Sequence, residues 1–177
     1  TGEILIGQNW DWIPEVDDTT IFLEIHQKDK PAIIILAEAG IIGKYGFNSN
    51  GVGLLLNALR SNVVDNTLLP VHFTIRKALE SKSVKDLLDT VKKTGIASAA
   101  NIRVGDPTQT LSLELTPKGC AEIRPDHLFS TVAHTNHLLN KHFQELFPTE
   151  PILNSDLRYE RVMELSELST NSDATVE

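Results

Sequence analysis

Apolar and polar positions alternate with a period of two in the first third of the chain, and this period predicts β-strands. In residues 20–26 three aliphatic side chains fall on one face, and the apolar run Ala32 to Ala37 follows. The segment 27–31 between them has the charged residues and proline of a turn, so the two runs are predicted to pair as a hairpin. An earlier run, Glu3 to Trp10, is apolar almost throughout, which predicts a strand covered on both faces.

A second hairpin is predicted directly downstream. Its strands are residues 45–47 and 52–58, and its turn ends in Asn50-Gly51, two residues that both tolerate positive φ. Later segments with the same alternation predict further strands at residues 97–104, 110–115 and 119–123.

The period changes to that of a helix after Pro70, which opens a segment whose apolar residues share one face. A second helix is predicted from its cap, Ser83, to a stop at Gly95, with apolar residues spaced at i, i+3, i+4 and i+7. A last helix is predicted from Ser155 to about Leu168. The polar tail, residues 169–177, is expected to fray.

This order of hairpins, helices and hairpins favours an α+β fold, with an antiparallel sheet layered with helices in one domain over residues 1–168. The net charge of −8 argues against binding to nucleic acid, and no apolar run approaches the roughly 18 residues that span a membrane. The only cysteine, Cys120, excludes an internal disulfide and fits a reducing compartment, so a cytoplasmic or peroxisomal protein is expected. No targeting peptide is visible after Thr1.

Three polar residues are candidates for carbonyl chemistry. Asp11 ends the first predicted strand, where its carboxylate could hold an amine or an attacking group; the alternative is an Asp that opens a turn. Asn57 ends an apolar strand, where an amide is costly unless it is paired. Asn136 lies in His134-Thr135-Asn136-His137, and its alternative is a turn residue. A carboxamide N–H can stabilise an oxyanion without titrating.

The two histidines of that motif suggest a metal site, but such a site needs a third ligand. Neither His127 nor His142 lies at helical i+4 spacing from His134 and His137, so we predict no metal.

A nucleophile is not visible in the chain. The predicted strand at 119–123 points Cys120 beside the charged Glu122, which favours a structural cysteine. Thr1 could act as a terminal nucleophile, but Thr1-Gly2 fits the turn before a strand better.

Several short motifs, in this order, resemble one family of enzymes. They are Gly7-Gln8-Asn9-Trp10-Asp11, Glu38-Ala39-Gly40-Ile41-Ile42-Gly43-Lys44, Gly46-Phe47-Asn48-Ser49, Asn57-Ala58-Leu59, Ala78-Leu79-Glu80-Ser81 and His134-Thr135-Asn136-His137. The family is that of the acyl-coenzyme A:6-aminopenicillanic-acid acyltransferases (isopenicillin N acyltransferases), a group of N-terminal-nucleophile hydrolases. The opening residues are more distantly similar to choloylglycine hydrolases.

The resemblance implies a four-layer αββα sandwich whose precursor cleaves itself to free an N-terminal cysteine. The thiol of that cysteine is the nucleophile, and its own α-amino group is the base. Asp11 matches the family's catalytic Asp, Asn136 matches its oxyanion Asn, and Asn57 matches an Asn that lines the site in the bile-salt branch. Gln8 replaces an arginine of many choloylglycine relatives, which argues against bile-salt-type recognition.

The nucleophilic cysteine of the family would lie about one strand upstream of Thr1-Gly2, and the family continues past Glu177. We therefore expect this chain to be an internal fragment, incomplete at both ends, that associates with a second chain from the same precursor.

The predicted function is acyl transfer or hydrolysis at the amide or thioester bond of a small molecule. Acyl-coenzyme A is a candidate substrate, and no resident cofactor is expected. Two alternatives stay open: a catalytically inactive protein of the same fold that binds a ligand or partner, and a histidine-based metal protein.

Overall fold

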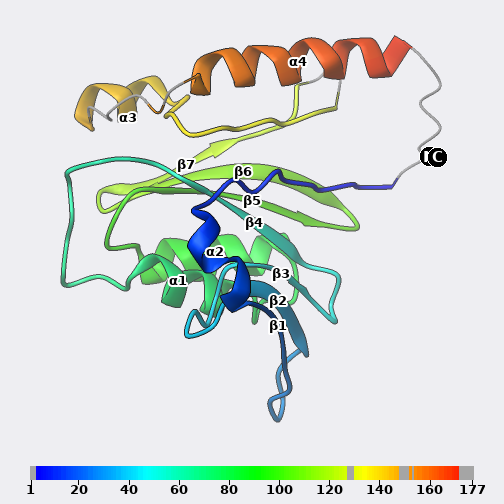
Figure 1. The fold of residues 1–177 in the computed structure, drawn as a ribbon, viewed down its shortest axis with the longest axis vertical. Coiled ribbons are helices and arrows are strands. Elements are labelled where there is room, and N and C mark those ends of the chain that lie inside the picture. The colour runs from blue at the N-terminus through cyan, green and yellow to red at the C-terminus, as the bar shows by residue number, and fades with distance from the viewer. Residues whose placement is uncertain (1–2, 127–129, 148–151, 153, 172–177) are drawn as a thin grey trace.

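The structure, a computed structural model, describes residues 3–126, 130–147, 152 and 154–171, and a seven-stranded antiparallel sheet forms its centre (Figure 1). The strands lie side by side in chain order: β1 Thr20–Ile25, β2 Ile33–Glu38, β3 Tyr45–Asn48, β4 Gly53–Ala58, β5 Ala100–Asp106, β6 Gln109–Thr116 and β7 Gly119–Ile123. Both predicted hairpins and the three later strands are confirmed. Gly51 has φ 82° in the second turn, as the Asn-Gly signal predicts.

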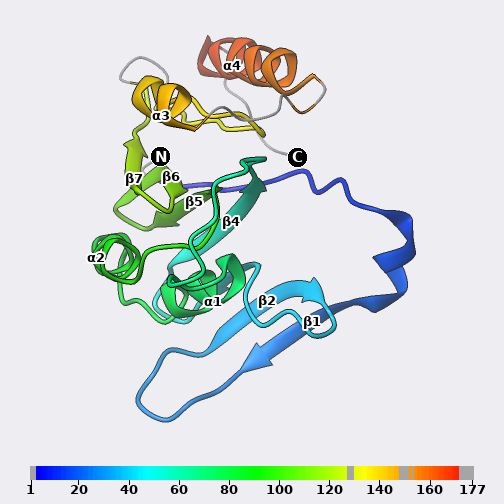
Figure 2. The same cartoon turned by 90° about the vertical axis from the view of Figure 1, so that its left-hand side faces the viewer.

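Two helices, α1 Val71–Ala78 and α2 Val84–Thr94, follow β4 and precede β5 in the sequence, and they cover one face of the sheet (Figure 2). The predicted cap of α2 is confirmed, because the Ser83 hydroxyl accepts a hydrogen bond from the backbone N–H of Asp86. Alternate residues of the strands meet the helices in an apolar core. Its fully buried members include Ile35, Leu54, Ile75, Leu87, Ile102, Val104 and Leu113.

The prediction that residues 3–10 form a strand was wrong. Within the described residues this segment is extended but joins no β-ladder, and it crosses the sheet face opposite α1 and α2. Ile6 lies directly over two glycines: a Cβ built on Gly53 would stand 2.5 Å from its Cδ1, and one on Gly105 would stand 3.1 Å from its Cγ2. The run is therefore covered on one side only, and Leu5 on its other side is 81% exposed.

Two further helices, α3 Lys141–Leu146 and α4 Ser155–Asn171, lie on the other side of strands β5 to β7 from α1 and α2 (Figures 1 and 2). The last predicted helix is thus confirmed, and it continues past its predicted end at Leu168 to Asn171. The rest of the predicted tail, residues 172–177, lies outside the described residues. The sequence did not predict α3 or the short 3-10 helix η1 Pro14–Thr19.

The α+β class is confirmed by this antiparallel sheet and its helices. The described residues contain one sheet, so the second sheet of the four-layer sandwich stays a prediction.

The register of β4, β5 and β6 determines which polar residues share the face opposite α1 and α2. Asn57 pairs with Asn101, and Asn101 pairs with Glu114, so these three side chains form a row across the sheet. Asn101 and Glu114 are fully buried.

Candidate active site

A cavity of about 1100 Å³ brings together all three residues predicted to act on a carbonyl group, Asp11, Asn57 and Asn136. They come from the N-terminal segment, from β4 and from the loop between β7 and α3. The remaining wall includes Trp10, Glu38, Lys44, Arg60 and Arg158. The fold thus places in one cavity side chains that are far apart in the sequence.

Asp11 is exposed at the cavity wall, and the residues just before it fix the course of the chain. The side-chain amide of Gln8 donates to the backbone oxygen of Leu56 and accepts from its N–H, which ties the segment to β4. Trp10 packs edge-on against Tyr45 with a centroid distance of 5.4 Å. These contacts hold the segment that carries Asp11 beside the cavity.

A partly buried ion pair forms another part of the wall. The Lys44 ammonium donates to both carboxylate oxygens of Glu38, at 2.6 and 2.8 Å, and its Nζ lies 4.2 Å from the centre of the Trp10 ring. Burial raises the pKa of Glu38, but the hydrogen bond and charge of Lys44 outweigh burial and hold it below its usual value. Burial, and then the charge of Glu38, raise the pKa of Tyr45. The wall therefore carries one fixed pair of opposite charges.

Close packing on α1 positions that lysine. A Cβ on Gly43 would stand 2.4 Å from the backbone oxygen of His72 and 2.6 Å from the backbone nitrogen of Arg76, so only glycine fits. The ring Nδ1 of His72 lies 2.7 Å from the Gly43 oxygen and can donate to it. Glu38 and Lys44 both belong to a motif that carried the family resemblance, but no local pattern indicated that they would pair at this cavity.

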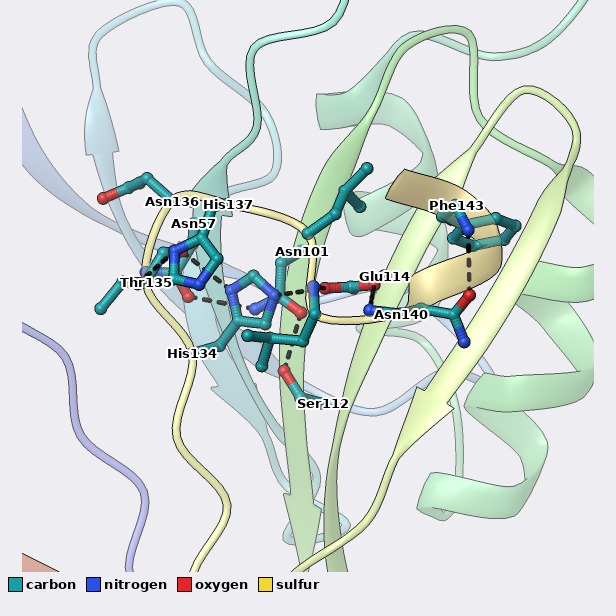
Figure 3. Close-up of polar contacts among 12 residues, drawn as sticks. Asn57, Asn101, Ser112, Glu114, His134, Thr135, Asn136, His137, Asn140 and Phe143 are labelled. Atoms are coloured by element: carbon teal, nitrogen blue, oxygen red, sulfur yellow. Dashed lines mark hydrogen bonds and ion pairs between the residues drawn. The ribbon is translucent and has the colours of Figure 1, made fainter. Parts of the chain in front are cut away.

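Asn57 is held by a row of buried polar side chains (Figure 3). The amide nitrogen of Asn101 donates to Asn57 Oδ1 at 3.1 Å, and the hydroxyl of Ser112 donates to Asn101 Oδ1 at 2.7 Å. Asn101 and Ser112 are both fully buried. Sequence reasoning missed both, although a polar residue between aliphatic neighbours in each strand was a usable signal.

Asn136 is fixed through its backbone and its side chain. Its N–H donates to Ser155 Oγ at 2.8 Å, and its amide nitrogen donates to the Ala58 oxygen at 3.0 Å. Arg158 donates to Asn136 Oδ1 at 2.9 Å. The first turn of α4 and the end of β4 therefore set the orientation of this amide.

The two motif histidines hold the loop in place. His134 Nε2 lies 2.8 Å from the Glu114 carboxylate, and both side chains are completely buried. The same carboxylate accepts hydrogen bonds from the backbone N–H groups of Leu139 and Asn140. His137 Nδ1 lies 2.8 Å from Ser155 Oγ, and burial, followed by the charge of His134, lowers the pKa of His137.

Cys120 lies in β7, where it packs against the apolar core rather than lining the cavity. Burial raises the pKa of its thiol to about 11. The thiol is therefore neutral near pH 7, which agrees with the structural cysteine predicted from the sequence.

The fold and the cavity define an α+β domain with a carboxylate and two carboxamides around one site. A model of the family described as acyl-coenzyme A:6-aminopenicillanic acid acyl-transferase matches residues 1–177. The chain belongs to this family, as its motifs predicted.

Two individual proteins illustrate the similarity. The chain is 37% identical, over 163 residues, to the acyl-coenzyme A:6-aminopenicillanic-acid-acyltransferase 40 kDa form of Emericella nidulans. The match covers 91% of this chain and 45% of the relative, so the chain spans about half the relative's length. Among solved structures, a variant of conjugated bile acid hydrolase from Clostridium perfringens matches with a TM-score of 0.48 and 13% identity, over 66% of this chain and 40% of that one.

Within the described residues, no helix combines the length and the apolar character needed to cross a membrane.

Proposed function

We propose that the full-length protein transfers or hydrolyses the acyl group of a small amide or thioester, through an N-terminal cysteine that self-cleavage releases upstream of this chain. The observation that carries the proposal is the convergence of Asp11, Asn57 and Asn136 on one cavity. Membership of an acyltransferase family supports it.

In the proposed mechanism, Asp11 accepts a hydrogen bond from the α-amino group of the terminal cysteine and orients it as the base. The amine takes the thiol proton as sulfur attacks the carbonyl carbon. Asn136 and Asn57 donate N–H groups to the oxyanion that forms. When the intermediate collapses, the leaving amine or thiol takes the proton, and an amine or water then attacks the acyl-enzyme and regenerates the thiol.

We also propose that acyl-coenzyme A serves as an acyl donor and that the upstream piece of the precursor stays associated as a second chain. In the proposed site the residues of this chain supply all the polar groups for the oxyanion, so no resident cofactor is needed.

The test is intact mass spectrometry with N-terminal sequencing on protein made from the full-length gene, beside an alanine variant of the upstream cysteine. We expect two chains, the larger beginning with cysteine, and one uncleaved chain in the variant. Hydrolysis of a panel of N-acyl amides and acyl-coenzyme A thioesters then tests activity, and Asn136→Ala should lower kcat by about 100-fold or more. One uncleaved wild-type chain without turnover would leave a ligand- or partner-binding protein of this fold.

A further inference from the structure

We infer that Asn101 and Ser112 are positioning residues that hold the Asn57 amide with its N–H₂ group toward the cavity. The inference rests on the proposed function, because it assigns the N–H₂ group of Asn57 to the oxyanion. It begins with the buried row in Figure 3, where Ser112 donates to Asn101 and Asn101 donates to Asn57.

The direction of this row follows from the hydroxyl at its buried end. Ser112 is 0% exposed, and a buried hydroxyl that donates to nothing is costly. Among the described residues its acceptor is Asn101 Oδ1, 2.7 Å away. If the row ran in the opposite direction, the Asn101 amide nitrogen would face Ser112 and the hydroxyl would lose this acceptor. Ser112 therefore sets the direction in which both amides point.

The consequence appears at the other end of the row. Because Asn101 donates to Asn57 Oδ1, the oxygen of the Asn57 amide is occupied and its nitrogen is left as the donor. Asn57 lines the cavity with Asp11 and Asn136. An oxyanion needs hydrogen-bond donors, whereas the reversed Asn57 amide would present its own oxygen to the cavity and repel the oxyanion.

Packing alone gives no reason for these residue types. Asn101 is 0% exposed, and its neighbours on the opposite face, Ala100 and Ile102, are apolar core residues. A buried amide and hydroxyl stabilise a fold no better than aliphatic side chains of similar size. Control over the orientation of Asn57 accounts for their presence on this face.

The decisive variant is Asn101→Asp, which keeps the shape and changes the donor into an acceptor. An ionised carboxylate would accept from Ser112 and from the Asn57 nitrogen, so the Asn57 amide would rotate and turn its oxygen to the cavity. We expect kcat to fall by about 100-fold or more with a much smaller change in KM.

Lowering the pH should partly reverse this defect. A protonated carboxyl group again donates to Asn57 Oδ1, so the ratio of variant to wild-type kcat should rise as pH falls. Burial and the neighbouring Glu114 raise the pKa of the introduced carboxyl. Two groups oppose them when charged: Arg103, on the same face of β5, and His134, which contacts Glu114 from the loop between β7 and α3. Asn101→Leu, the matched control, has no titrating group and should show a low ratio that does not change with pH. Ser112→Ala should lower kcat by a few-fold, because the direction of the row is then no longer fixed.

A measurement without turnover separates this inference from the proposed function. In protein labelled with ¹⁵N-asparagine, the Asn57 side-chain N–H₂ signal, assigned by its loss in Asn57→Ser, should exchange with water in the wild type and become protected in Asn101→Asp at neutral pH. If wild-type protein turns over no substrate, the proposed function fails and this signal alone decides the orientation. Unchanged Asn57 signals, or a ratio independent of pH in a folded Asn101→Asp variant, would overturn the inference.

Discussion

Replacing Glu114 with alanine should loosen the loop that carries Asn136. The carboxylate accepts from three donors of that loop: the ring of His134 and the backbone N–H groups of Leu139 and Asn140. Since Glu114 comes from β6, it ties the loop between β7 and α3 to the central sheet. Ser155, at the start of α4, makes four further hydrogen bonds to this loop, so Glu114 ties the loop to the sheet and Ser155 ties it to α4.

The expected magnitude follows from the burial of the pair. Glu114 and His134 have completely buried side chains, and removing one partner of such a pair costs about 3–5 kcal/mol. The two backbone donors are only partly buried, so water can satisfy them and they add roughly 1 kcal/mol or less. We therefore expect Glu114→Ala to lower the free energy of unfolding by about 3–6 kcal/mol. Glu114→Gln keeps one acceptor oxygen and should lose about 1–3 kcal/mol.

Urea unfolding of the full-length protein measures both variants, with Glu160→Gln as the control. Glu160 is exposed on α4, so its substitution should change the unfolding free energy by no more than about 0.5 kcal/mol. In the Glu114→Gln variant, kcat should fall more than KM rises, since Asn136 loses its position. The reasoning is refuted if Glu114→Ala is as stable as the Glu160→Gln control.

Three further predictions concern the wall of the cavity and the cysteine. Gly43→Ala should destabilise the protein by about 1–3 kcal/mol in urea unfolding, because its Cβ meets the backbone of α1 at 2.4 Å; a neutral result would contradict the close packing. Lys44→Met leaves Glu38 without its partner. The pKa of Glu38 is lower in the folded protein than its unfolded value of 4.5, so the ion pair stabilises the fold at pH values above 4.5. This contribution is lost as the pH falls through the folded pKa. The difference in unfolding free energy between wild type and variant should therefore narrow in acid. With a pKa of about 11, Cys120 should react with iodoacetamide at pH 8 far more slowly than in urea-unfolded protein, and Cys120→Ala should keep its kcat; equal rates would show an accessible thiolate.

Much of the fold followed from local patterns, because those patterns have local causes. The turn at Asn50-Gly51 and the cap at Ser83 are decided by backbone conformation and a nearby hydrogen bond, and both were predicted correctly. The segment 3–10 was mispredicted because an extended apolar run has the same sequence pattern whether it pairs as a strand or lies across the face of a sheet. Only the glycines on β4 and β5, distant in sequence, decide between these two outcomes.

The candidate site was likewise predicted only in part. Asp11, Asn57 and Asn136 were proposed from residue type and family motifs, and the structure places them around one cavity. Glu114 was missed, because its partner His134 follows it by 20 residues and nothing local indicates the pairing. The histidines suggested a metal site, which their spacing argued against, but their partners Glu114 and Ser155 could not be predicted because only folding brings them together.

The register of three strands links these missed residues to the predicted ones. Asn57, Asn101 and Glu114 stand opposite one another across β4, β5 and β6, on the same face of the sheet. Asn101 orients Asn57, and Glu114 anchors the loop that carries Asn136. Since side chains alternate between the faces of a sheet, a shift of β5 by one residue would turn Asn101 into the apolar core and bring Ile102 to the polar face. The apolar core that fixes this register, with Leu54, Ile102 and Leu113 beneath the helices, therefore also fixes the geometry of both candidate oxyanion donors.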